Sequence, residues 1–207
     1  MKNAIRFTPL ILAVAMTTAA FGQIASTAHN LNNWPGLTIS TPNGANQVCL
    51  PCHVPHNAYP DPVGTIDEVL WNHTDTTVNF TMYTTLSGQQ GGQPEGTSKM
   101  CLSCHDGVTA IDSYGGATGT ITLAGRASAI GEGGDLTDDH PIGIVYPTGA
   151  DGYNDPTGFQ GVQLVTVNGV ADRVECSSCH DPHSAALTAF LRRTLDESAI
   201  CLECHNK

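Results

Sequence analysis

The eight cysteines constrain this 207-residue chain more than any other feature, because all of them fall into one repeated pattern. In each copy two residues separate the cysteines, and a histidine follows the second cysteine directly. The copies, called motifs 1 to 4 in chain order, are Cys49-Leu-Pro-Cys52-His53, Cys101-Leu-Ser-Cys104-His105, Cys176-Ser-Ser-Cys179-His180 and Cys201-Leu-Glu-Cys204-His205. Four copies with no cysteine left over indicate one chemistry used four times.

The Cys-x-x-Cys-His pattern is the attachment signature of c-type haem. Two thiols three positions apart lie on one side of a helical turn, so they can form thioethers to the two vinyl groups of one porphyrin. The histidine that follows then meets the iron from the proximal side. We therefore expect four haems c per chain, bound through all eight cysteines, with proximal iron ligands His53, His105, His180 and His205.

Other interpretations of the cysteines fit less well. Zinc ribbons also use paired cysteines, but they do not need a histidine after every pair. A thioredoxin-like redox site has a single pair beside a βαβ unit. A disulfide framework suits an exported chain with an even cysteine count, but it would not place a histidine after all four pairs.

The second axial ligands must come from the five remaining histidines, which are His29, His56, His73, His140 and His183. The chain thus has enough histidines to place one on both sides of every iron, with one left over. Met82 is the one methionine that could serve instead. His56 and His183 each follow a proximal histidine by three residues, after a proline that fixes an extended step.

A histidine so close to a proximal ligand is on the wrong face for the same iron, so we expect His56 and His183 to bind a neighbouring haem. His140 stands before a proline and is also an expected ligand. The residues alone do not choose between His29 and His73.

The charge balance and the N-terminus bear on partners and compartment. Nineteen acidic residues against eight basic ones argue against nucleic acid, whose phosphates need clustered Lys and Arg. Residues 1–22 have a basic start, an apolar run and small residues, which predicts a signal peptide and export. The run is too short for a membrane anchor, and we expect no membrane span.

Residues 23–207 are predicted to form one tetrahaem cytochrome c domain. It divides into a haem pair at 49–106, a Gly- and Thr-rich insert at 113–170 and a second pair at 176–206. The expected fold is mostly irregular and haem-packed, because the apolar content is too small for a large protein core. Short helices should carry the motifs, the best from Asp196 to His205 with Asp196 or Ser198 as N-cap. Asn168-Gly169 predicts a hairpin between residues 162–167 and 170–174.

Several sequence stretches resemble one family. They are the Pro-His steps after motifs 1 and 3, Leu70-Trp71-Asn72, Thr81-Met82-Tyr83, Cys101-Leu-Ser-Cys-His-Asp-Gly107 and His140-Pro-Ile-Gly143. Together they look like the multihaem cytochromes with doubled motifs, and most like the tetrahaem cytochromes that polymerise outside the cell into conductive filaments, the OmcE type. The resemblance covers the chain from about His29 to its C-terminus.

The resemblance implies histidine on both sides of each iron, haems stacked in a continuous row and protomers joined end to end. In that family a histidine near the mature N-terminus ligates a haem of the neighbouring subunit, which corresponds by position to His29. The implied distal set is therefore His29, His56, His140 and His183, and His73 becomes the spare histidine.

The predicted function is electron transfer by a secreted protein that is not an enzyme. The resemblance makes it a subunit of an extracellular filament, a head-to-tail homopolymer that passes electrons to other redox proteins or external acceptors. One alternative is a monomeric periplasmic shuttle with the same haems. Another is a multihaem oxidoreductase, which would need an iron with an open axial position.

Overall fold

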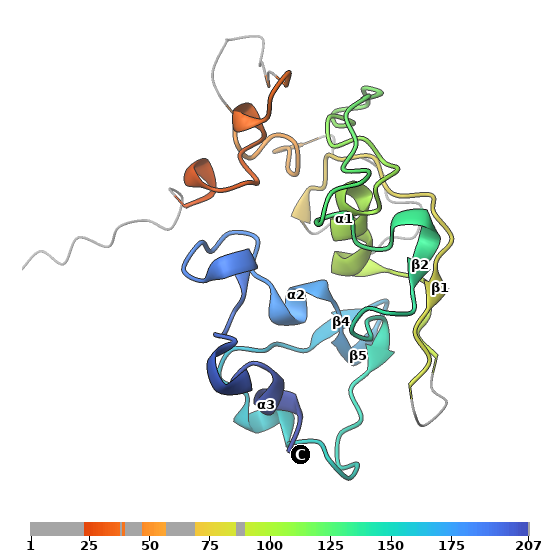
Figure 1. Cartoon of the computed structure of the whole chain (residues 1–207), viewed down its shortest axis with the longest axis vertical. Helices are drawn as coiled ribbons and strands as arrows, with labels where there is room; N and C mark the ends of the chain where they lie inside the picture. Colours follow the sequence, from red (N-terminus) through yellow and green to blue (C-terminus); the bar gives the residue numbers. More distant parts are fainter. Residues whose placement is uncertain (1–22, 38, 40–46, 57–68, 86–89, 207) are drawn as a thin grey trace, which may run out of the picture.

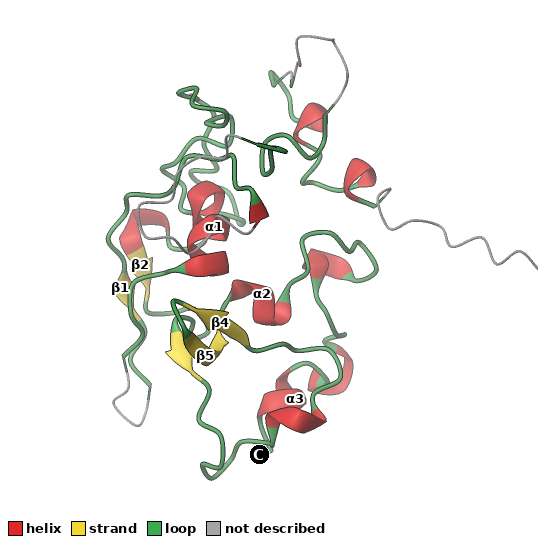
Figure 2. Cartoon of the chain, turned by 180° about the vertical axis from the view of Figure 1, so that it is seen from behind, coloured by secondary structure: helices red, strands yellow, loops and turns green. Residues whose placement is uncertain are grey.

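The computed structural model describes residues 23–37, 39, 47–56, 69–85 and 90–206. The predicted signal peptide at 1–22 lies outside the described residues. Among the residues that are described, no helix has the length and apolar character needed to cross a membrane. Loops and turns make up most of the chain, as the green segments of Figure 2 show.

Three of the four motifs carry a short α-helix. Motif 2 ends helix α1 (Gly96–His105), motif 3 forms α2 (Cys176–Cys179) and motif 4 forms α3 (Cys201–Cys204). Motif 1 departs from the prediction, because it forms a single turn, closed by the His53 N–H donating to the Cys49 carbonyl at 2.8 Å, and no helix. The three helices follow one another along the long axis of the molecule (Figure 1).

The predicted helix from Asp196 to His205 is wrong in its extent. A 3-10 helix covers Asp196–Ser198, and α3 begins only at Cys201 with Ile200 as its N-cap. Glu197 and Ser198 have φ of 51° and 60°, which is left-handed backbone that a continuous α-helix does not admit. The other 3-10 helices of the described chain are Ile24–Ser26, Leu31–Asn33, Glu132–Gly134, Pro156–Gly158 and Thr188–Phe190.

Two small sheets support the motif helices. β1 (Thr81–Met82) pairs in parallel with β2 (Asp135–Leu136). The other sheet has the order β3-β5-β4, from β3 (Ile144–Val145), β5 (Val170–Val174) and β4 (Val165–Val167), with antiparallel pairing. The predicted hairpin is confirmed as β4–β5, with Asn168 and Gly169 at φ 52° and 76°, although its first strand begins at Val165 and is shorter than predicted.

The apolar core is small for a chain of this length. Its main cluster joins Phe80, Met82, Leu102 and Leu136, with Val78 and Ile142 packed against it. Met82 is only 5 % exposed in this cluster, so its thioether is used in packing. A mostly irregular chain with so little apolar packing is compatible with a core filled by cofactor.

Candidate haem-binding site

The folded chain brings proximal and distal histidines together from distant parts of the sequence. In three cases the two imidazole rings face each other with centroids about 6 Å apart, at interplanar angles from 27° to 70°. These pairs are His29 with His105 at 6.1 Å, His53 with His183 at 6.0 Å and His140 with His205 at 6.5 Å.

This spacing fits an iron held between two histidines. Two imidazole nitrogens that each lie about 2 Å from one metal ion place their ring centres roughly 6 Å apart. Each pair joins one proximal histidine to one histidine of the predicted distal set, and no pair joins two proximal ligands. The chain therefore has residues that fit the haem implied by its motifs.

The proximal rings are oriented by backbone carbonyls. His53 Nδ1 lies 2.6 Å from the Val69 carbonyl oxygen, and His180 Nδ1 lies 2.7 Å from that of Ala189. His105 Nδ1 lies 2.6 Å from the Ser128 carbonyl oxygen. Because a carbonyl oxygen only accepts, each Nδ1 must carry the hydrogen, which leaves Nε2 as the free ligand atom.

The cysteine sulfurs of successive motifs are electrostatic neighbours. The pKa of Cys104 is raised by burial and then by the nearby Cys52. The pKa of Cys101 is raised mainly by a hydrogen bond with Cys176. The pKa of Cys179 is raised by burial and then by Cys176 and Cys201. The thiols of motifs 1 and 2, of motifs 2 and 3, and of motifs 3 and 4 are thus close enough to influence one another.

His29 belongs to an N-terminal arm, residues 23–34, that lies against the loop after motif 3. Its ring stacks on Phe190 with centroids 4.4 Å apart and an interplanar angle of 9°. The Gln23 side-chain oxygen accepts a hydrogen bond from the Ala185 N–H at 2.8 Å. Burial, and then the nearby His105, lowers the pKa of His29. In this single chain His29 therefore faces His105 of its own chain.

His73 and His56 differ in their surroundings. His73 is 1 % exposed, with Nε2 at 3.4 Å from Cys104 Sγ and Nδ1 at 2.9 Å from the Thr74 carbonyl oxygen. Its ring pairs with no proximal ring in the described part of the chain. His56 is exposed, and so is the proximal histidine His180.

Sequence reasoning missed a buried polar junction between motifs 2 and 3. Ser98 of α1 donates to Glu175 and accepts from the Cys176 N–H at 3.0 Å. Arg173 Nε lies 2.9 Å from Glu175 Oε1, and its Nη1 lies 2.8 Å from Glu95 Oε2. Glu95 and Glu175 each precede a motif by only a few residues. This placement of a carboxylate before a motif is the sequence feature that could have predicted the junction.

One further observation supports a cofactor beside motif 1. The indole Nε1 of Trp71 is buried without an acceptor in the described part of the protein. Its ring centroid lies 6.4 Å from that of His53. A buried N–H normally has a partner, so a polar group of a bound haem is a suitable acceptor.

Comparison with known families agrees with this chemistry for the C-terminal part. Residues 168–207 match the family model described as the doubled CXXCH motif, and this stretch contains motifs 3 and 4. No curated protein matches the chain in sequence. The match and the four motifs indicate covalently bound haem c and the electron-transfer chemistry of a multihaem c-type cytochrome.

Proposed function

We propose that the chain carries four haems c, each held between two histidines, and passes single electrons along them. The three cross-segment histidine pairs carry this proposal, since each supplies two imidazoles at the spacing of one iron. We assign His56 to His180, because the other three proximal histidines already have partners. Haems 1 to 4, numbered by motif, then have distal ligands His183, His29, His56 and His140.

Two of these assignments link the halves of the chain. His183 follows motif 3 but faces the proximal ligand of motif 1, and His56 follows motif 1 and is assigned to motif 3. The Pro-His steps therefore exchange ligands between haems 1 and 3. Such an exchange holds those two haems close together, which favours rapid electron transfer between them.

The ligand set favours a carrier over an enzyme. When bound, haem c supplies a reversible one-electron iron couple. With an imidazole on each side, no coordination position is left for a substrate. Paired histidines also give a lower potential than a histidine and a methionine, which suits exchange with other low-potential haems.

The exported protein tests the proposal directly. Its intact mass should exceed that of the mature chain by four haems, and the oxidised protein should show only low-spin iron by electron paramagnetic resonance. Bare cysteines, or fewer than four haems, would overturn the tetrahaem assignment. Binding of carbon monoxide by the reduced wild-type protein would instead favour the oxidoreductase.

A secreted filament subunit is the second candidate. The resemblance to filament-forming cytochromes supports it, and the N-terminal arm offers a means of assembly. The arm contacts residues 181–190 through the His29–Phe190 stack and the Gln23–Ala185 hydrogen bond, and a neighbour's arm could make the same contacts. Such a head-to-tail contact repeats into a polymer unless it closes into a ring. The periplasmic shuttle would keep His29 on its own chain.

His29→Ala separates these two states. Either way, haem 2 should lose one ligand and become high-spin, while all four haems stay attached. If the arm binds a neighbour, wild-type protein forms filaments under the electron microscope and the variant does not. A wild-type protein that elutes as a monomer, at every concentration tried, supports the shuttle.

A further inference from the structure

Three segments with no common sequence fold against motifs 1, 3 and 4 in the same way. Each contains one residue whose backbone N–H donates to the carbonyl of the motif's second cysteine. These residues, called the clamp residues, are Asn72, Arg192 and Asn154, and their N–H groups lie 2.9, 2.8 and 2.9 Å from the carbonyl oxygens of Cys52, Cys179 and Cys204.

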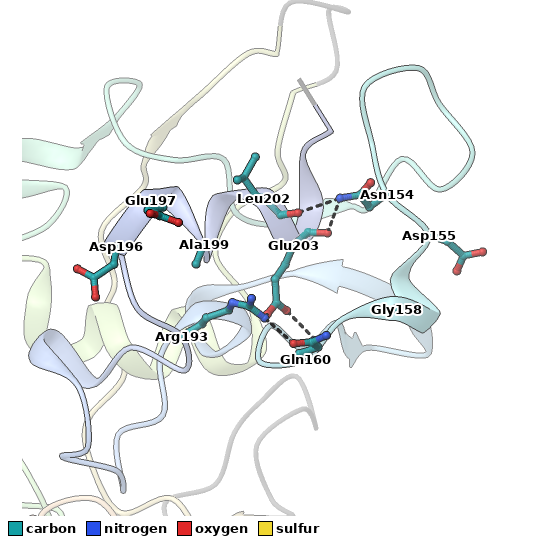
Figure 3. A pocket seen from close by; sticks show the side chains of 10 residues that line it. All are labelled: Asn154, Asp155, Gly158, Gln160, Arg193, Asp196, Glu197, Ala199, Leu202 and Glu203. Carbon is teal, nitrogen blue, oxygen red and sulfur yellow. Dashed lines mark hydrogen bonds and ion pairs between the residues drawn. The ribbon is translucent and has the colours of Figure 1, made fainter.

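The side chain of each clamp residue adds a second hydrogen bond to the same turn. In every case it donates to the carbonyl of the residue after the first cysteine. Asn72 Nδ2 lies 2.6 Å from the Leu50 oxygen, Arg192 Nε 2.8 Å from the Ser177 oxygen and Asn154 Nδ2 2.9 Å from the Leu202 oxygen. Figure 3 shows the Asn154 side chain donating to the Leu202 and Glu203 carbonyls of motif 4.

The residue two positions before each clamp residue completes the arrangement. Its carbonyl accepts from the N–H of the residue after the proximal histidine, at 3.0 Å for Leu70, 2.8 Å for Phe190 and 3.2 Å for Gly152. All three have left-handed backbone, with φ of 53°, 58° and 86°. This conformation is unfavourable for Leu and Phe, and it persists only where surrounding contacts determine it.

The segments also reach the proximal ligands. The carbonyls that accept from His53 and His180 belong to Val69 and Ala189, which stand three positions before Asn72 and Arg192. In motifs 1 and 3 the clamp segment therefore holds the carbonyl that orients the imidazole as well as the turn that carries the thiols.

Motif 2 provides an internal comparison. It ends the ten-residue helix α1, where Asp106 N–H donates to the Leu102 carbonyl within the helix. In motifs 1, 3 and 4 the corresponding carbonyls belong to Leu50, Ser177 and Leu202, and they accept from the clamp side chains instead. Motif 2 thus satisfies within its own helix a carbonyl that the other three motifs satisfy through a clamp residue.

We infer that Asn72, Arg192 and Asn154 are positioning residues that hold the thioether turn and its proximal histidine in place, and so set the reduction potential of haems 1, 3 and 4. This inference rests on the proposed haem ligation. A firm Nδ1–H contact to a carbonyl makes the imidazole a stronger donor to iron. Stronger donation stabilises the oxidised iron, so a loosened clamp should raise the potential.

The test uses the exported holoprotein. Asn72→Leu and Asn154→Leu remove the side-chain donor while nearly keeping its size and adding no charge. In a potentiometric titration, roughly a quarter of the haem absorbance should move to higher potential in each variant, since one haem of four is affected. The matched control is Asn79→Leu at an exposed asparagine, which should leave the titration unchanged.

If a variant binds haem poorly, the masses of its peptides show which motif has lost its haem. Loss of haem at motif 1 alone in Asn72→Leu, or at motif 4 alone in Asn154→Leu, supports the clamp. Loss spread over all motifs, or unchanged potentials in both Leu variants, overturns it. If the wild-type protein lacks four haems, the proposed function fails first, and the intact mass distinguishes that result.

Discussion

At the scale of single residues, the histidines divide by what lies around Nδ1 and Nε2. Proximal rings place Nδ1 on a backbone carbonyl and leave Nε2 for iron, as in His53 and His105. His73 also places Nδ1 on a carbonyl, but its Nε2 faces a cysteine sulfur. The group that faces Nε2 therefore distinguishes His73 from the proximal histidines.

Replacing a distal histidine by methionine should change one haem only. In His183→Met a thioether takes the place of imidazole opposite His53, and histidine–methionine ligation has the higher potential. One of four haems should then titrate well above the others in a potentiometric titration. His73→Asn, the control, should keep every iron low-spin and leave the titration unchanged. An unchanged titration in His183→Met would remove His183 from the ligand set.

At the scale of elements, the motifs are joined by buried polar groups more than by apolar packing. Arg173 of β5 contacts Glu95 before α1 and Glu175 before α2, and Thr97 Oγ lies 2.7 Å from Ser177 Oγ between the two helices. Burial raises the pKa of Glu175, while Ser98 and Arg173 oppose the shift. The relative placement of motifs 2 and 3 thus depends on a charged network.

Arg173→Met should destabilise the protein by about 3 to 5 kcal/mol at pH 7, because it leaves a buried carboxylate uncompensated. The loss should be smaller at pH 4. Without Arg173 the pKa of Glu175 rises further above its ordinary 4.5, so the protonated, stable form persists at low pH and stability falls as pH rises through the new value.

Urea unfolding at both pH values measures this effect. The double variant with Glu175→Gln should recover part of the loss at pH 7, since no charge is then buried. An equal loss at both pH values would show that Arg173 acts through packing alone.

The β4–β5 hairpin depends on its two-residue turn. Gly169 has φ of 76° with open space around it, so the strain of a side chain there comes only from the backbone. Gly169→Ala should lower the free energy of unfolding by about 1 to 2 kcal/mol. Urea unfolding tests this, and an unchanged midpoint would mean that the turn relaxes to another type.

At the scale of the whole molecule, the chain is long but its apolar cluster is small. The helices of motifs 2, 3 and 4 follow one another along the long axis of the molecule (Figure 1). Histidine pairs join segments that are distant in sequence. Covalent thioethers and metal bonds are suited to hold such a chain together where a core cannot.

A chain in which all eight cysteines are Ser should therefore not become compact. Small-angle scattering should give a radius of gyration nearer the roughly 46 Å of an unfolded chain of this size than the about 16 Å of a folded one. The holoprotein is the control. A compact haem-free chain would contradict the view that cofactors fill the core.

The sequence by itself determined the covalent chemistry, because thiol spacing within one helical turn and an adjacent histidine are local properties. The same is true of the β4–β5 turn, where Asn168-Gly169 alone selects the backbone. Tertiary structure decided which histidines face each other, since the members of the His29–His105 and His53–His183 pairs are far apart in sequence. It also decided the clamp, because Asn72, Arg192 and Asn154 share a backbone geometry that no common residue pattern encodes.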